Sequence, residues 1–246
     1  MSGTIYKAAS GALLQQMRLD VLSNNLANVN TSGFKADQPE FRLDLDAALW
    51  PRPPEPGQTL SPYSPPMQVG IDFSNGQIIQ TGNPLDVALM GDGFFEVQTP
   101  QGLAYTRNGN LSVNADGVLS TSDGLPVMGE GGEITIDGAR VEIGDNGDVV
   151  VDGDLVGRLK VVDFPRPYEL EKSGHTRFAP ARDGVVGQPA EQVTLSQGFV
   201  EASNVNAIRT MTEIIETTRV FESYQRVIRA SDDATSKAVN EVGRSV

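Results

Sequence analysis

Cysteine is absent from this 246-residue sequence, and histidine and tryptophan occur once each. A chain without cysteine holds no disulfide, no thiolate metal site and no thiol nucleophile. Long apolar runs are missing too. None approaches the ~18 residues that a membrane-spanning helix needs, and no apolar stretch with a cleavage site follows Lys7 near the N-terminus. We therefore expect no membrane span and no cleaved signal peptide.

Signatures of catalysis are also scarce. His175 is the one candidate imidazole base, and no nucleophile-elbow pattern surrounds it. The acidic turns at 145–148 and 152–154 lack the spacing and terminal glutamate of an EF-hand, and the glycine-rich stretches 91–93 and 129–132 lack the Lys-Ser/Thr of a phosphate loop. A glycosidase-type carboxylate pair stays open, because a sequence does not give spatial separations. We expect no enzyme activity, no metal and no cofactor.

The negative charge is concentrated in the middle of the chain. The net charge is −13, yet residues 1–35 carry three basic and one acidic side chain, and residues 204–246 carry six of each. Residues 36–203 therefore hold ten basic and twenty-five acidic groups, a balance of −15. Such a middle lacks the basic footprint that nucleic acid requires, and the nearly neutral ends are suited to packing against other protein.

The N-terminal segment has the periodicity of a helix. One stripe alternates steps of three and four residues, and a second stripe keeps the same rhythm on another face. A helix with two such faces needs two or more neighbours. We expect it to run from Ile5 to Thr31, ~40 Å long, with Gly33 as its stop. The first stripe is Ile5, Ala8, Ala12, Gln15, Leu19, Leu22, Leu26 and Val29, and the second is Ser10, Leu14, Met17, Val21, Asn24 and Asn28.

Four asparagines lie near the end of this helix, in the stretch SNNLANVNTSGFK at 23–35. Asparagine is a poor helix former. Asn24 and Asn28 continue the second stripe, and Asn25 borders the first. Such residues fix register and partner number at contacts between helices, or they cap and fray a helix end before a turn. The sequence leaves both interpretations open.

A connector follows at 34–68. Seven of the sixteen residues in 51–66 are proline, which excludes a helix and a central strand and predicts an extended, semi-rigid segment. A proline-rich ligand for another module is the alternative.

Residues 69–202 have the pattern of an all-β domain. Short apolar runs alternate with turn signals, which is typical of a sandwich or barrel. The pair Asn108-Gly109 lies between strands predicted at 105–107 and 111–113, and it predicts a hairpin there.

The chain returns to helix in its last segment, 203–246. Ser203 and Asn204 are plausible caps, and apolar stripes continue as far as Val242, ~55 Å at 1.5 Å per residue. The predicted fold class is therefore mixed α and β. An all-β central domain, sandwich or barrel-like, is combined with long terminal helices that pack together as a coiled-coil-like axial domain.

Several motifs of this chain occur together in one known family. The stretch SNNLANVNTSGFK resembles the N-terminal signature of bacterial flagellar rod and hook proteins. The stretches 84–88, 91–95 and 105–109 resemble that family's β-domain motifs, in the same order, and Ser203–Asn206 is similar to its C-terminal signature. These matches extend over nearly the whole chain. Ser32 departs from the family pattern, which often has proline there.

The resemblance implies a structural subunit of the flagellar basal-body rod, exported unfolded by the flagellar type III apparatus without a cleaved signal. It implies that the terminal helices line the inside of a drive-shaft tube in the periplasmic space while the β-domain faces outward. The partners would be further copies of the chain and the adjacent proximal and distal rod proteins, with no nucleic acid. A proximal rod subunit fits the length and single β-domain best, and a distal rod subunit is the alternative.

The stripes and the resemblance together predict an assembly interface on the two terminal helices. Its residues are Ile5, Leu14, Met17, Leu19, Val21, Leu22, Asn24, Asn25, Leu26, Asn28, Val29, Asn204, Asn206, Met211, Ile214, Phe221, Tyr224 and Ile228. An acidic secreted β-protein that binds calcium or carbohydrate is the alternative from another functional class. It would keep its function in the β-domain and have dispensable ends.

Overall fold

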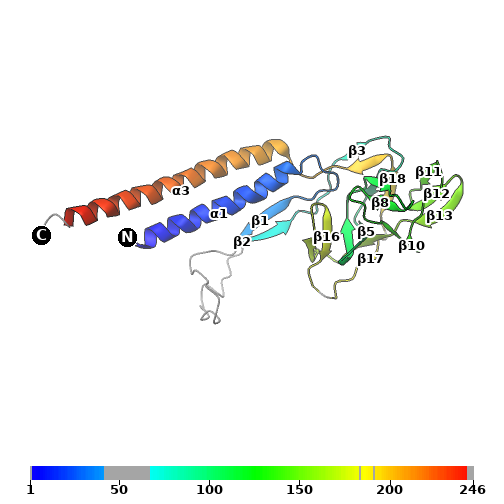
Figure 1. Ribbon diagram of the computed structural model, residues 1–246, viewed down its shortest axis with the longest axis horizontal. Coiled ribbons are helices and arrows are strands. Elements are labelled where there is room, and N and C mark those ends of the chain that lie inside the picture. Colours follow the sequence, from blue (N-terminus) through cyan, green and yellow to red (C-terminus); the bar gives the residue numbers. More distant parts are fainter. Residues whose placement is uncertain (1, 42–66, 183, 191, 243–246) are drawn as a thin grey trace. The chain divides into compact units, whose positions relative to one another are not determined.

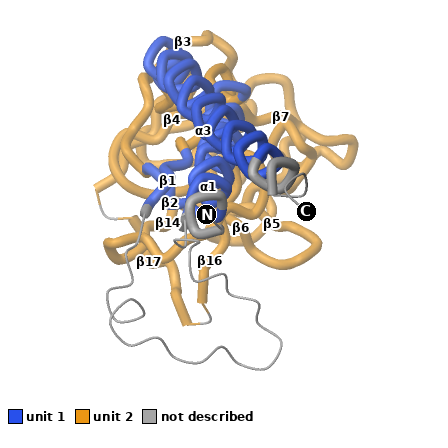
Figure 2. The backbone as a smooth tube through the Cα atoms, turned by 90° about the vertical axis from the view of Figure 1, so that its left-hand side faces the viewer, with its two compact units in different colours: residues 1–27, 37–72, 206–246 blue, residues 28–36, 73–205 orange. Residues whose placement is uncertain are grey.

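The computed structural model describes residues 2–41, 67–182, 184–190 and 192–242 (Figure 1). The proline-rich stretch 51–66, predicted to be a connector, lies outside these residues. The chain divides into two compact units, coloured separately in Figure 2. We call residues 1–27, 37–72 and 206–246 the helical unit, and residues 28–36 and 73–205 the outer unit.

The described residues of the helical unit form two helices and a β-ribbon. Helix α1 (Ser2–Ala27) lies antiparallel beside helix α3 (Ala207–Val242), and it also packs against strand β1 (Figure 1). Strands β1 (Asp37–Phe41) and β2 (Met67–Ile71) pair antiparallel. Helix α1 ends four residues before the predicted Thr31, because Asn28–Thr31 form a turn and Gly33 adopts a positive φ of 69°. Helix α3 ends at the predicted Val242.

The outer unit contains many short antiparallel strands. Its largest sheet has six strands in the order β15-β16-β6-β5-β14-β17, and the others have two or three. The strands of this unit are β3 (Ile78–Gln80), β4 (Val87–Met90), β5 (Phe94–Thr99), β6 (Gly102–Thr106), β7 (Leu111–Val113), β8 (Leu119–Thr121), β9 (Met128–Gly129), β10 (Gly132–Glu133), β11 (Val141–Ile143), β12 (Asp148–Val151), β13 (Asp154–Arg158), β14 (Val161–Asp163), β15 (Leu170–Lys172), β16 (Arg177–Pro180), β17 (Gln188–Pro189), β18 (Thr194–Gln197) and β19 (Phe199–Glu201).

The six-stranded sheet has a core on each face, because its side chains alternate along the strands. Phe95 and Val97 of β5 belong to an aliphatic core with Leu119, Val127, Ile134 and Val149. Phe94 points to the other face, into an aromatic cluster whose rings meet edge-on or tilted, with centroids 4.8–6.1 Å apart. That cluster consists of Phe73, Phe94, Tyr105, Phe164, Tyr168 and Phe178.

The predicted fold class is wrong. The described chain is mainly β, with an open six-stranded sheet in place of a closed barrel or a two-sheet sandwich. Short apolar runs locate strands in a sequence, but they do not reveal whether the outermost strands of a sheet meet.

The coiled-coil-like axial domain is part of the same error. A coiled coil inserts large apolar side chains into its seam at every heptad. Among the described residues, the buried side chains of α1 are Ala8, Ala12, Leu22 and Asn25, and those of α3 are Thr210 and Thr217, while Met17 of the predicted second stripe is exposed. Small and polar side chains thus interrupt the buried faces of the described helices, and these faces do not form a continuous leucine seam.

The hairpin predicted at Asn108-Gly109 is also wrong. Strand β6 pairs with β5 and β16, and β7 pairs with β8, so the two strands flanking this dipeptide do not pair with each other. Glycine is required at position 109 because the backbone of Val87 lies close to it. A Cβ on Gly109 would lie 1.6 Å from the carbonyl oxygen of Val87. The Val87 amide also donates a hydrogen bond to the Gly109 carbonyl at 2.9 Å.

No helix in the described part of the chain is long and apolar enough to span a membrane.

Candidate assembly interface and polar hub

The predicted interface residues differ widely in exposure. On α1 and the turn after it, Leu22, Asn25 and Asn28 are buried, Leu14, Leu19, Val21, Leu26 and Val29 are half-buried, and Met17 and Asn24 are exposed. Ile5 belongs to α1, but its side chain lies outside the description. On α3 and the segment before it, Ile214, Phe221, Tyr224, Ile228 and Asn204 are half-buried, and Met211 and Asn206 are exposed.

Both helices of the helical unit carry large apolar side chains that the chain itself leaves exposed. On α1 these include Tyr6 and Leu13, one heptad apart and 62% and 50% exposed. On α3, Ile208, Met211 and Ile215 follow helical spacing and are 79%, 50% and 54% exposed. Rows of exposed apolar side chains on one face mark surfaces that associate with other protein. The helical unit therefore has an exposed apolar row of this kind on each helix.

Gly11 allows the two helices to approach closely. A Cβ at this position would lie 2.6 Å from ring atoms of Tyr224 on α3, much closer than a non-bonded contact permits. Tyr224, predicted as an interface residue, thus packs against the helix of its own chain.

Asn25 binds the backbone of its own chain. Its amide nitrogen donates to the Asp37 carbonyl and its amide oxygen accepts from the Asp37 amide, both at 2.8 Å. Asn25 is 5% exposed. The side chain thereby acts like a neighbouring strand and holds the first residue of β1 beside α1.

The two predicted asparagines near α3 also bind their own chain. Asn206 caps the helix, since its side-chain oxygen accepts from the Arg209 amide at 3.0 Å and its carbonyl from the Thr210 amide at 2.9 Å. Asn204 lies in the outer unit, where its oxygen accepts from the Ala36 amide at 2.8 Å and its nitrogen donates to the Ser74 carbonyl at 3.1 Å.

The outer unit contains a buried cluster of charges that the sequence did not predict. Lys35, Arg107 and Glu201 are 0%, 3% and 1% exposed. Lys35 Nζ lies 2.8 Å from Glu201 Oε1, and Arg107 Nη1 lies 3.3 Å from Glu201 Oε2. With Ser74 and Asn204 these residues form what we call the polar hub. The sequence feature that could have indicated these buried charges is a charged residue directly beside a large apolar one, as in Phe34-Lys35 and Val200-Glu201.

The charged groups of the polar hub have further hydrogen-bond partners, as buried charges require, while Arg107 Nε is buried without one in the described part of the chain. Lys35 Nζ also donates to the Ser74 carbonyl at 2.7 Å. The Glu201 carboxylate accepts a third hydrogen bond, from the Gly76 amide to Oε1 at 2.8 Å. Arg107 Nη2 donates to the Gly91 carbonyl at 2.6 Å. The hub is therefore a hydrogen-bonded network built from segments far apart in the sequence.

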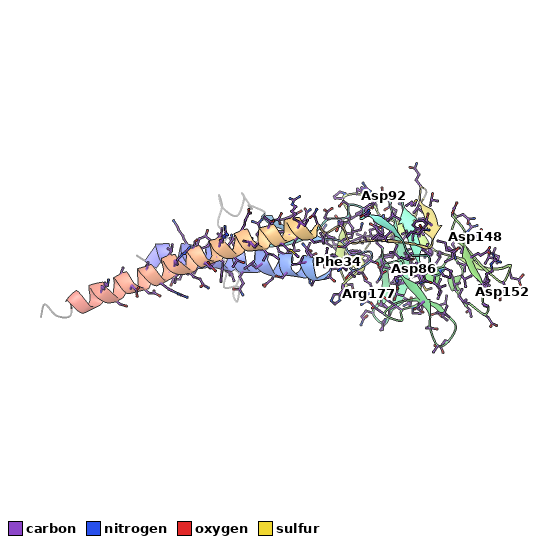
Figure 3. All side chains as sticks on the ribbon, turned by 90° about the horizontal axis from the view of Figure 1, so that it is seen from above. Phe34, Asp86, Asp92, Asp148, Asp152 and Arg177 are labelled. Atoms are coloured by element: carbon purple, nitrogen blue, oxygen red, sulfur yellow. The ribbon has the colours of Figure 1, made fainter. Side chains whose placement is uncertain are left out.

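The residues weighed for catalysis or metal binding are scattered over the surface. His175 and Asp145 are exposed, and Figure 3 shows Asp148 and Asp152 at the end of the outer unit opposite Phe34. Hydrogen bonds from Arg158 and then Asn146 lower the pKa of Asp148 below its ordinary value. Among the described residues no group of three or more histidine, aspartate and glutamate side chains is arranged to hold a metal ion.

Two long paired helices with exposed apolar rows, joined to a β-rich unit, are the features of a structural subunit rather than of a ligand-binding site. Three family models match the chain. "Flagella basal body rod protein" matches residues 5–35, "Flagellar hook protein FlgE/F/G D1 domain" residues 88–151, and "Flagellar basal body rod FlgEFG protein C-terminal" residues 196–241.

Full-length relatives agree with these models. The flagellar basal-body rod protein FlgF of Caulobacter vibrioides is 32% identical over 99% of both chains. FlgF of Salmonella typhimurium is 35% identical over 97% of both, and FlgG of Bacillus subtilis is 34% identical over 98% of this chain and 99% of its own. The chain belongs to the flagellar basal-body rod protein family, as the motifs in its sequence predicted.

Proposed function

We propose that the chain is a structural subunit of the flagellar basal-body rod, of the FlgF-like proximal type. The observation that carries this proposal is its similarity, over essentially the whole length, to several proteins named FlgF. A FlgG-like distal rod subunit is the second candidate, and it is favoured by the FlgG relatives of similar identity.

The subunit has no enzymatic role in this proposal. The segments 1–33 and 203–246 build the axial part of the rod, and 69–202 forms its outward-facing part. The exposed apolar rows on α1 and α3 support this division, because assembly would remove them from water at ~25 cal/mol for each Å² buried. The partners are further copies and the neighbouring rod proteins.

The proposed location is the rod in the periplasmic space, reached through the flagellar export apparatus without a cleaved signal. Support comes from the family and from the absence of cysteine, since a rod subunit in an oxidising compartment gains from having no thiol that could form a wrong disulfide.

The predicted interface residues remain part of the proposal. Leu14, Met17, Met211 and Ile214 would contact neighbouring subunits directly. Asn25, Asn204 and Asn206 would contribute by holding the helix ends and adjoining segments in place, in keeping with their hydrogen bonds within the chain.

Ile208→Asp and Leu155→Asp test the proposal as a matched pair in a strain that lacks its own copy of the protein. Ile208 on α3 is 79% exposed and Leu155 on β13 is 65% exposed, so neither change empties a core. Aspartate in the first turn of α3 is also favourable for the helix. We expect Ile208→Asp to be exported but to build no rod, and Leu155→Asp to build rods and support swimming.

The readouts are immunoblots of exported protein and electron microscopy of basal bodies. The opposite pattern, with rods from Ile208→Asp and none from Leu155→Asp, would favour the β-protein alternative. Complementation of strains lacking FlgF or FlgG separates the two candidate members, and we expect rescue of the former.

A further inference from the structure

The chain crosses between the helical unit and the outer unit four times. The crossings follow residues 27, 36, 72 and 205. The segments of the outer unit next to these crossings are 28–36, 73–77 and 201–205. Any force that passes along the chain from α1 or α3 into the outer unit therefore enters through one of these three segments.

The polar hub binds all three segments together. Lys35 belongs to the first, Ser74 and Gly76 to the second, and Glu201 and Asn204 to the third. Backbone bonds strengthen the arrangement: the Gly33 amide donates to the Glu201 carbonyl at 2.7 Å, and the Asn204 amide donates to the Phe34 carbonyl at 3.4 Å. The first and third segments thus lie side by side.

The hub is also fixed to the interior of the outer unit. Arg107 connects Glu201 to the carbonyls of Leu89 and Gly91, at the end of β4. Gly33 packs directly against the backbone next to Arg107, because a Cβ on Gly33 would lie 2.3 Å from the Asn108 amide nitrogen. Arg107 therefore anchors the chain crossings to the β-sheets.

The hub consists of charged groups where stability alone does not require them. Lys35, Arg107 and Glu201 are at least 97% buried, and both cations bind the Glu201 carboxylate. Replacing buried ions by apolar residues of similar size is often neutral or stabilising. The buried ammonium group of Lys35 therefore carries a cost of desolvation, and what it adds is the tie between the first segment and the other two.

We propose that the polar hub is a mechanical joint that keeps the crossing segments together under torque. It binds segments 28–36, 73–77 and 201–205 to one another. Torque that reaches the outer unit along the chain is then carried by all three segments together, and no segment detaches singly. This inference rests on the proposed function as a rod subunit. Lys35 is the decisive positioning residue, since its ammonium group joins 28–36 to both 73–77 and 201–205.

Lys35→Met is the variant that cuts this tie with least disturbance. Methionine occupies a similar length in the buried site, and the remaining Arg107–Glu201 pair is electrically balanced. Lys160→Met is the matched control: Lys160 Nζ also forms a 2.8 Å ion pair, with the buried Glu96 of β5, but it lies outside the three crossing segments.

Amide hydrogen exchange of the purified full-length variants measures the joint itself. In Lys35→Met we expect the Gly33, Ala36 and Gly76 amides to exchange about a hundredfold faster, as the loss of a buried charged partner implies. The Val127 amide, bonded to the Leu119 carbonyl in the aliphatic core at 2.9 Å, should exchange as in the original protein. Unchanged exchange rates at the Gly33, Ala36 and Gly76 amides would overturn the proposal that the hub is a joint.

Swimming in dilute and in viscous medium tests the function of the joint in cells. We expect Lys35→Met cells to assemble rods and swim normally in dilute medium, but to lose several-fold more filaments than Lys160→Met cells in viscous medium. Equal filament losses from the two strains at every viscosity would refute the role of the hub under torque. Exported Lys35→Met protein that forms no rods would also refute it, because the hub would then serve assembly. If Lys35→Met is exported poorly, Asn204→Leu cuts the tie to Ala36 and Ser74 and is judged by the same outcomes.

The proposed function can fail independently of this inference. If the original chain does not restore rods in a strain lacking its own copy, the rod proposal is wrong before any hub variant is examined.

Discussion

Asn25 and Asp37 are joined by two hydrogen bonds of 2.8 Å, one in each direction, between an amide side chain and a peptide backbone. The pair is local to the helical unit, where α1 lies beside β1. It explains why a poor helix former occupies a buried position in the last turns of α1: leucine could fill the space, but it could not bind an amide and a carbonyl at once.

Asn25→Leu should therefore destabilise the helical unit. Leucine gains up to ~0.5 kcal/mol in helix propensity, but the Asp37 backbone groups lose partners in a partly buried site, at a cost of ~1–3 kcal/mol for a group left unsatisfied. We expect a net loss of stability and faster exchange of the Asp37 amide. Asn24→Leu, on the exposed side of the same turn, is the control. Thermal melting that ranks the two variants equally would contradict this role.

Gly11→Ala tests how closely the helices pair in the free subunit. In an isolated helix the change is stabilising by ~1 kcal/mol, but here the new Cβ would meet the Tyr224 ring at 2.6 Å. We expect a lower melting temperature for Gly11→Ala, and a smaller effect of the same change in a Tyr224→Ala background. Circular dichroism of the four proteins gives the coupling between the two sites. A higher melting temperature for Gly11→Ala alone would mean that the Tyr224 ring turns aside and that its contact with Gly11 adds nothing to stability.

The sequence predicted most where local patterns suffice. Residues 23–35, the stretches 84–88, 91–95 and 105–109, and Ser203–Asn206 together were enough to predict the family. The same reasoning failed at Gly109, which is dictated by the approach of Val87 rather than by a turn. The dipeptide Asn108-Gly109 indicates that glycine is required at position 109, but it does not indicate which part of the chain packs against that glycine.

The polar hub lay beyond sequence reasoning for a physical reason. Lys35 and Glu201 are 166 residues apart, and each alone has the character of a surface residue, since lysine and glutamate are almost never fully buried unless paired. Only the tertiary fold brings them together. The coiled-coil seam was predicted wrongly for a similar reason, because the periodicity of α1 does not distinguish a continuous leucine seam from a face that also contains Ala8, Ala12 and Gly11.

His175→Ala and the paired change Asp145→Asn with Asp148→Asn should leave rods and swimming intact. Their side chains lie on the surface of the outer unit, and the exposed Asp148–Arg158 pair contributes little because water and salt screen it. Soft-agar motility with immunoblots for export is the measurement. A non-motile but normally exported and folded variant would revive the enzyme or metal interpretation.

Tyr105 should make the outer unit lose stability in alkaline solution. Burial, and then the charge of Glu96, raise the pKa of this phenol above its ordinary value of 10.0. The folded chain thus keeps the Tyr105 proton at pH values where the unfolded chain releases it, and the free energy of unfolding falls as the pH rises through the unfolded and then the folded pKa. Below about pH 10 the contribution is complete and independent of pH.

Tyr105→Phe removes this titration and keeps the buried ring. We expect urea unfolding at neutral pH to change little, and the decline of stability above about pH 10 to become less steep than in the original protein. Tyr168, whose pKa burial also raises, keeps part of the slope, so the double change with Tyr168→Phe should flatten it further. Tyr168 also donates a hydrogen bond to Asp163 at 3.0 Å. The free energy of unfolding of Tyr168→Phe at neutral pH therefore measures the contribution of that hydrogen bond. Identical slopes in the original chain and in Tyr105→Phe would show that the Tyr105 phenol ionises as readily in the folded unit as in the unfolded chain.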